Sequence, residues 1–323
     1  MKKMTLKKNL IINQKIIIND GLIGGGKSLL SNVVSGLPKV DQWILDYRIE
    51  QTIGLLYLKK IDLNTAKYIL KSNYNQLFYD NSMLRHANFR KSDLTSILKH
   101  PRYKNLKKRM NPSDETVYRN YKNKIILHFC THNIGVFSKS LFESFGKNLV
   151  FLQLLRSPLN IDVLKRISFF TEIWKSANGR YQLVTKFNAK HKQNVPFYIN
   201  QPNKYCSANK YEKTILILEK ILNPGKLNLS SLEKKYKSKV ILIPFENFIT
   251  DPKKYVKKIA SALKVSLDKI TNNVIKKNSL PRKFSLLKNN EEGIKFIKKK
   301  VRKAYLQKLI KINEYYENTF LIK

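Results

Sequence analysis

The strongest chemical signal in this sequence is a glycine-rich segment close to its N-terminus. The segment fits the pattern G-x-x-x-x-G-K-S/T, which binds phosphate groups through backbone N–H groups. Glycines let these groups turn toward an anion, and the helix that follows adds unpaired donors and a partial positive charge. The alternative is an ordinary glycine-rich turn before a helix. We expect an anion to be bound by Gly21, Gly24, Gly25, Gly26, Lys27, Ser28 and Leu29.

Two further polar side chains directly follow apolar runs that are typical of buried strands. His132 comes after the run 124–129, where an imidazole is suited to act as a general base near neutral pH. Arg156 comes after the run 148–155 and can present its planar guanidinium to a phosphate. The alternatives are a solvated or capping histidine and an arginine that forms a salt bridge.

A carboxylate suited to hold Mg²⁺ is harder to find. Enzymes that use ATP or GTP on such a loop need an acidic residue after an apolar strand. The strands here end in His128, Arg156 and Glu246, and for Glu246 we expect a structural hydrogen-bonding role. Only Asp46, after the run 42–45, could hold the metal. The sequence therefore predicts no metal site and favours a donor that reacts without Mg²⁺.

The elements that position these residues alternate along the chain. Apolar strand-like runs are found at 15–18, 42–45, 124–129, 148–155 and 239–244. Helical segments are expected at 28–35, 64–71, 138–145, 210–221 and 252–263, the last capped by Asp251. This alternation predicts a three-layer α/β fold with a mainly parallel central sheet and helices on both faces. Ligands then bind at the C-terminal ends of the strands.

The remaining segments are assigned by their composition. We expect one domain over 1–323, with a helical or loop insertion at about 70–120 and an irregular stretch at 188–209. Both are expected to shape the pocket for an acceptor. The tail from about 291 to 323 has apolar residues at helical spacing, which predicts one amphipathic helix packed on the core.

The composition excludes several classes of function. The net charge is +41, but only 11 of the 63 basic residues are arginine, and the lysines are spread along the whole chain. This pattern reflects a coding bias toward Lys, Ile and Asn, so we expect general attraction to acidic surfaces and no specific nucleic-acid binding. No run is long and apolar enough to cross a membrane. Cys130 and Cys206 lie far apart, which favours reduced thiols and a cytoplasmic location.

The ordered motifs resemble the sulfotransferase family, which uses 3′-phosphoadenosine 5′-phosphosulfate (PAPS) on a P-loop fold. The segment 21–40 resembles the family's phosphosulfate loop and the short element that follows it. Cys130-Thr131-His132 is similar to its Lys-Thr-His element, and Arg156-Ser157-Pro158 to its Arg-Asp-Pro element. The segments 245–252 and 262–265 and the pair Arg282-Lys283 resemble its later motifs. The matches cover about residues 15–285 in the family's order.

The resemblance implies a role for each matching residue. Lys27 would stabilise charge on the leaving phosphate, and His132 would take the proton of the acceptor. Arg156, together with Arg282 and Lys283, would bind the 3′-phosphate of PAPS and of its product PAP. The acceptor would be a hydroxyl or amine of a small molecule, a glycan or a lipid.

The sequence also departs from the family pattern. Gly24 stands where the family loop carries a catalytic Lys or Arg, and Lys27 replaces a Thr. The family's downstream phosphate-binding Ser is Leu164 here, with Ser168 out of register. Two alternatives therefore stay open. One is a kinase that uses ATP or GTP with Mg²⁺ on Asp46, and the other is a non-catalytic protein that binds a nucleotide or a glycan.

Overall fold

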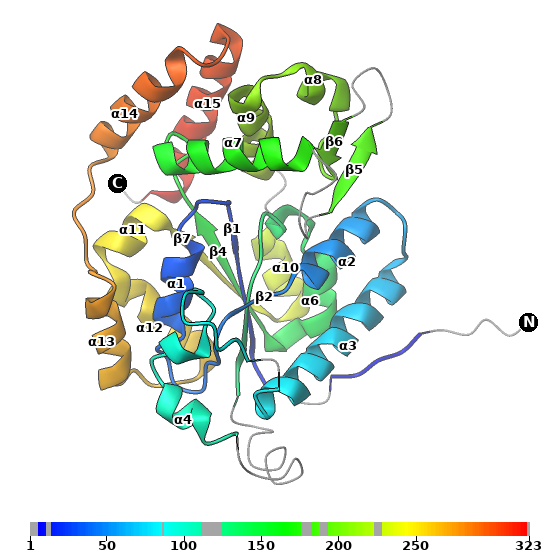
Figure 1. Ribbon diagram of the computed structural model, residues 1–323, viewed down its shortest axis with the longest axis vertical. Helices are drawn as coiled ribbons and strands as arrows, with labels where there is room; N and C mark the ends of the chain where they lie inside the picture. The colour runs from blue at the N-terminus through cyan, green and yellow to red at the C-terminus, as the bar shows by residue number, and fades with distance from the viewer. Residues whose placement is uncertain are drawn as a thin grey trace, which may run out of the picture.

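The centre of the molecule is a five-stranded parallel sheet with the strand order β2–β3–β1–β4–β7 (Figure 1). A computed structural model describes residues 6–10, 14–85, 87–110, 125–175, 183–187, 193–222 and 228–321. The strands are β1 (Ile16–Gly21), β2 (Ile44–Leu45), β3 (Leu127–Cys130), β4 (Leu149–Leu155) and β7 (Lys239–Pro244). The predicted α/β fold with a mainly parallel sheet is confirmed.

The register of the central strands brings the predicted site residues to one edge. Both β1 and β4 are buried along their whole length, as expected for parallel strands covered on both faces. Gly21, the last residue of β1, pairs with Leu154 near the end of β4. The glycine-rich loop and the residues that follow β3 and β4 therefore start from the same edge of the sheet.

Helices cover both faces of the sheet. One face carries α1 (Lys27–Val34), α12 (Pro252–Leu263) and α13 (Lys269–Lys277). The other carries α2 (Tyr47–Tyr57), α3 (Leu63–Ser82), α6 (Lys139–Phe145) and α10 (Leu229–Tyr236). Helix α12 has the predicted bounds, whereas α3 continues to Ser82, well past the predicted end at 71. It continues because Tyr74, Leu77 and Phe78 keep its buried face apolar.

A further helical layer lies over the C-terminal ends of the strands, at the top of Figure 1. It contains α7 (Ile161–Lys175), α9 (Lys210–Ile221) and α15 (Lys303–Phe320), which share one hydrophobic core. A hairpin of β5 (Val184–Phe187) and β6 (Gln193–Pro196) and the short helix α8 (Pro202–Ser207) adjoin it. The stretch 188–209 was predicted to be irregular, but in its described part it forms β6 and α8.

The C-terminal tail is two helices, and the prediction of one helix is wrong. Helix α14 (Leu286–Lys298) ends before α15 begins at Lys303. Glu212, at the start of α9, accepts hydrogen bonds from the backbone and guanidinium of Arg302 at 2.7–3.2 Å. Asn209 also donates to the carbonyl of Lys300. These contacts hold the chain in a turn that the helical spacing of apolar residues could not reveal.

Only part of the segment 70–120 is an insertion, as the sequence predicted for the whole of it. Its first residues belong to α3, and its described remainder contains η1 (Ile97–Lys99) and α4 (Tyr103–Lys107), while 111–120 lies outside the described residues. The other elements are η2 (Gly135–Phe137), η3 (Gly146–Asn148) and α11 (Phe245–Thr250). In the described ranges, no helix combines the length and apolar character needed to cross a membrane.

Candidate active site

The glycine-rich loop, residues 21–28, joins the end of β1 to the start of α1. Gly24 and Gly26 have φ angles of 80° and 96°, a region that residues with a Cβ rarely adopt. Gly26 is the N-cap of α1, and no side chain caps this helix. The first N–H groups of α1 are therefore left for another acceptor, as the motif predicts.

Lys27 folds back onto the loop in this structure. Its Nζ donates to the carbonyl oxygens of Gly21 and Leu22 at 2.8 and 2.7 Å, and the residue is 6% exposed. Burial lowers the pKa of Lys27, while the nearby Cys130, Asp20 and Glu50 act in the opposite direction. Lys27 Nζ therefore lies beside the loop. An anion bound there would replace its two hydrogen bonds to carbonyl oxygens with a stronger ion pair.

Asp20 ties the loop to the segment that follows β3. Its carboxylate accepts hydrogen bonds from Thr131 Oγ1 at 3.0 Å and from the backbone N–H groups of Ile134 and Gly135. Burial raises the pKa of Asp20, and Lys27 and these donors oppose the rise. The backbone N–H of Asn133 also donates to the carbonyl of Gly21. These bonds fix His132 beside the loop.

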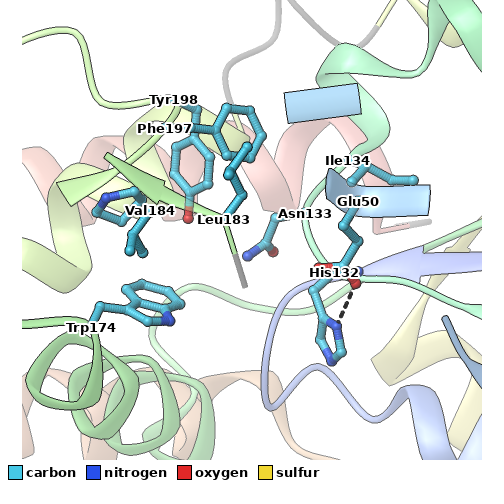
Figure 2. A pocket seen from close by; sticks show the side chains of 10 residues that line it. Glu50, His132, Asn133, Ile134, Trp174, Leu183, Val184, Phe197 and Tyr198 are labelled. Carbon is cyan, nitrogen blue, oxygen red and sulfur yellow. Dashed lines mark hydrogen bonds and ion pairs between the residues drawn. The ribbon is translucent and has the colours of Figure 1, made fainter. Parts of the chain in front are cut away.

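His132 forms a hydrogen-bonded pair with Glu50, a residue of α2 that the sequence did not single out. Glu50 Oε1 lies 2.9 Å from both Nδ1 and the backbone nitrogen of His132 (Figure 2). The ring of Tyr47 stacks on the imidazole with centroids 6.1 Å apart. A carboxylate at Nδ1 holds the proton there and leaves Nε2 as the proton acceptor. This geometry suits the general-base role expected for His132, which stays a prediction.

A small pocket adjoins this pair, and its walls are mostly apolar. Figure 2 shows Trp174 and Val184 across the pocket from His132 and Glu50. Its cavity of about 30 Å³ has room for a water molecule, so a larger acceptor needs the walls to move apart. The other lining residues are Asn133, Ile134, Leu183, Pro196, Phe197 and Tyr198. The stretch 188–209 contributes Pro196, Phe197 and Tyr198 to this pocket, whereas no described residue of the predicted insertion lines it. That the pocket receives an acceptor stays a prediction.

Arg156 reaches the glycine-rich loop from the end of β4. Its Nη1 donates to the carbonyl of Gly24 at 2.7 Å, and its Nη2 donates to Asp162 at 3.2 Å. The guanidinium lies 4.4 Å from the ring centroid of Phe245, and a Cβ on Gly26 would collide with that same ring. Arg156 therefore forms the salt bridge weighed from the sequence and also lies against the loop, and its binding of a phosphate stays a prediction.

Arg282 and Lys283 are not brought to the loop by any contact among the described residues. The guanidinium of Arg282 donates to the carbonyls of Asn278 and Ser279 at the end of α13. The backbone N–H of Arg282 donates to the carbonyl of Ile249 in α11. In this conformation Arg282 closes the end of a helix, and Lys283 beside it is exposed.

The comparisons with known proteins give similarity of structure without similarity of sequence. No family model matches the chain, and no curated protein matches it significantly. Several solved structures that it resembles are sulfotransferases. The sulfotransferase domain of the Synechococcus PCC 7002 olefin synthase aligns with 97% of this chain and 98% of its own, at 12% identity and a TM-score of 0.46.

Two mycobacterial sulfotransferases align in the same way. STF9 from Mycobacterium avium covers 96% of this chain and 78% of its own length, at 11% identity and a TM-score of 0.44. STF1 from Mycobacterium tuberculosis covers 90% of this chain and 76% of its own length, at 13% identity and a TM-score of 0.39. Values this low do not assign the chain to a family, so its function has to be argued from the residues of the site.

The structure also accounts for the departures from the sulfotransferase pattern. Leu164 is fully buried in the core, and Ser168 Oγ donates to the carbonyl of Lys165 on its own helix. Gly24 packs so closely on α7 that a Cβ there would lie 2.9 Å from the Cβ of Arg166. The loop therefore has no room for the basic residue at this position, and the exposed Arg166 lies beside it instead.

The two remaining carboxylates considered from sequence have structural contacts. Asp46, the predicted metal ligand of a kinase, caps α2 and pairs with the guanidinium of Arg48 at 2.9 Å. Glu246 is buried and accepts hydrogen bonds from the backbone of Ser157 and from the hydroxyl of Tyr316. The structural role expected for Glu246 is confirmed, and the kinase alternative gains no support.

Proposed function

We propose that this protein is a sulfotransferase that moves a sulfuryl group from PAPS to a hydroxyl or amine of its acceptor. The observation that carries the proposal is the His132–Glu50 pair, which lies between a pocket and the glycine-rich loop. A loop that binds anions and an oriented imidazole base are the two parts that such a transfer requires.

The residues around the loop fit the anionic end of PAPS. The uncapped start of α1 offers backbone donors, and the positive φ angles of Gly24 and Gly26 keep the loop free of side chains. Lys27 and Arg156 each donate a hydrogen bond to a carbonyl of the loop and supply two positive charges there. When bound, PAPS supplies an activated sulfuryl group whose leaving group is a phosphate.

Each side chain then has a defined task. Lys27 leaves the carbonyls of Gly21 and Leu22, pairs with the anion, and stabilises the charge that develops on the leaving phosphate. Glu50 keeps the proton of His132 on Nδ1, so that Nε2 accepts the proton of the attacking hydroxyl or amine. The products are a sulfated acceptor and PAP, and the transferred proton is left on His132.

The surroundings of the pair bear on the acceptor and its compartment. Aromatic and aliphatic walls favour an acceptor whose reactive group is carried on an apolar body, within a small molecule, a glycan or a lipid. The excess positive charge supports attraction to acidic substrates or surfaces. Both cysteines are buried free thiols, which supports a reducing, cytoplasmic compartment.

Transfer of labelled sulfate from PAPS to a panel of alcohols, phenols, amines and glycans tests the proposal. The wild type should label at least one acceptor, and His132→Ala should lower kcat by about 10²- to 10⁴-fold. Glu172→Gln, an exposed carboxylate on α7, is the matched control and should retain full activity. Absence of a labelled product, together with absence of PAP binding, would contradict the proposal.

A further inference from the structure

A second concave region lies away from the glycine-rich loop, at the other end of α1. It is a groove of about 700 Å³ between the end of α1, the helix α13 and the segment around η1. Figure 1 shows these elements together at the lower left of the molecule. Its lining residues are Asn32, Ser35, Gln42, Leu94, Leu98, Lys99, His100, Pro101, Ile270, Asn273, Val274, Lys277 and Asn278. It shares none of them with the pocket beside His132.

His100 in the wall of this groove is held in place by two backbone contacts. Its Nδ1 accepts a hydrogen bond from the backbone N–H of Arg102 at 3.1 Å, and the ring also has a hydrogen bond with the backbone of Val40. Ser35 Oγ, on a residue that is 1% exposed, is buried without a hydrogen-bond partner among the described residues. Neither atom faces the open space of the groove, so the polar groups that a ligand would meet are the exposed lysines and amides of the lining.

The charges around the groove favour an anion. Lys99 and Lys277 line it, and no acidic residue does. The neighbouring carboxylates are already neutralised, because Asp41 pairs with Arg109 at 3.0 Å and Asp268 pairs with Arg102 at 2.7 Å. A ligand that carries a phosphate, sulfate or carboxylate group would meet unopposed positive charge.

The rest of the wall fits hydroxyl groups. Asn32, Gln42 and Asn273 offer side-chain amides, which both donate and accept hydrogen bonds as sugar hydroxyls do. Asn32 Oδ1 accepts from Trp43 Nε1 at 3.1 Å, which fixes the orientation of that amide. The lining holds no Phe, Tyr or Trp ring on which a nucleobase could stack, and the imidazole of His100 is buried.

We propose that this groove binds a carbohydrate that carries an anionic group. The lysines would bind the anion, the amides would bind hydroxyl groups, and Leu98 and Val274 would contact the C–H faces of the sugar. A groove of about 700 Å³ lies in the range of small-ligand sites. The proposal does not depend on the reaction assigned to the loop.

Calorimetric titration of the full chain with glucose 6-phosphate, glucuronate and glucose tests the proposal. At least one of the two anionic sugars should bind, glucose should bind more weakly, and the comparison identifies the preferred anion. Lys277→Glu should weaken binding by at least about tenfold. Lys276→Glu is the matched control, because this neighbouring lysine is also exposed but does not line the groove.

Two further variants test whether the sugar binds in the groove and not at the glycine-rich loop. Asn273→Ala removes an exposed amide that lines the groove, so it should weaken binding by about tenfold. Lys27→Ala should leave sugar binding unchanged, since Lys27 belongs to the loop and not to the groove. Failure of both anionic sugars to bind, equal effects of Lys276→Glu and Lys277→Glu, or loss of binding in Lys27→Ala would each overturn the proposal.

Discussion

His128 gives a quantitative test of how tightly this sheet is packed. The residue lies on β3 with no exposed surface, and its Nε2 is 3.5 Å from Ser31 Oγ on α1. Burial lowers the pKa of His128 from 6.5 to about 3. Between these two values the unfolded chain binds a proton that the folded chain does not. The contribution of His128 to stability is therefore complete above pH 6.5 and is lost as the pH falls.

The size of the effect at pH 5 follows from the unfolded chain alone. Each pH unit below 6.5 costs about 1.4 kcal/mol as long as the folded imidazole stays neutral, so the loss at pH 5 is about 2 kcal/mol. This loss of stability is nearly independent of the pKa of His128 in the folded protein, provided that this pKa lies well below 5. His100, whose pKa burial lowers to about 4, contributes a similar amount and is present in both proteins compared below.

Urea unfolding of the wild type and of His128→Asn at pH 7.5 and pH 5 measures this contribution. The wild type should lose about 2 kcal/mol more than the variant on acidification. Ser31→Ala is the control, because it removes the hydrogen-bond partner and leaves the titrating ring in place. Equal acid sensitivity in the wild type and His128→Asn would refute the reasoning, since it would mean that the folded protein can protonate this ring.

Two further predictions concern the active site. Glu50→Gln should lower kcat by about tenfold or more while leaving KM for PAPS nearly unchanged, because His132 loses the carboxylate that orients its ring. Gly24→Arg should not raise activity, and Gly24→Ala should destabilise the protein by more than about 1 kcal/mol in urea unfolding. Gly146→Ala is the control for Gly24→Ala, because Gly146 also has a positive φ but a Cβ added there would have space. Equal losses of unfolding free energy in the two alanine variants would exclude a role for the packing of Gly24 on α7.

The parts of the site that lie at strand ends could be predicted from the sequence. Continuous apolar runs fix β1 and β4, and parallel strands bring their C-terminal ends to one edge. The positions of the glycine-rich loop, His132 and Arg156 at that edge follow from this rule. Their chemical roles remain predictions.

The partners of these residues could not be predicted in the same way. Glu50 lies on α2, 82 positions away from His132, and no local motif connects the two. The turn between α14 and α15 depends on Glu212 and Asn209 of a distant helix, so the apolar spacing of the tail alone predicted a continuous helix. The resemblance assigns Arg282 to the 3′-phosphate, whereas in the structure its guanidinium donates hydrogen bonds to carbonyls at the end of α13.

Calorimetric titration of the protein with PAP in the presence of EDTA tests the central claim most directly. The sulfotransferase account predicts that PAP binds, that Mg²⁺ does not strengthen the binding, and that Arg156→Gln weakens it by at least about tenfold. At a concentration of about 100 times its Kd, PAP should also stabilise the fold by about 2.7 kcal/mol. Binding of ATP that requires Mg²⁺, with no binding of PAP, would contradict the account.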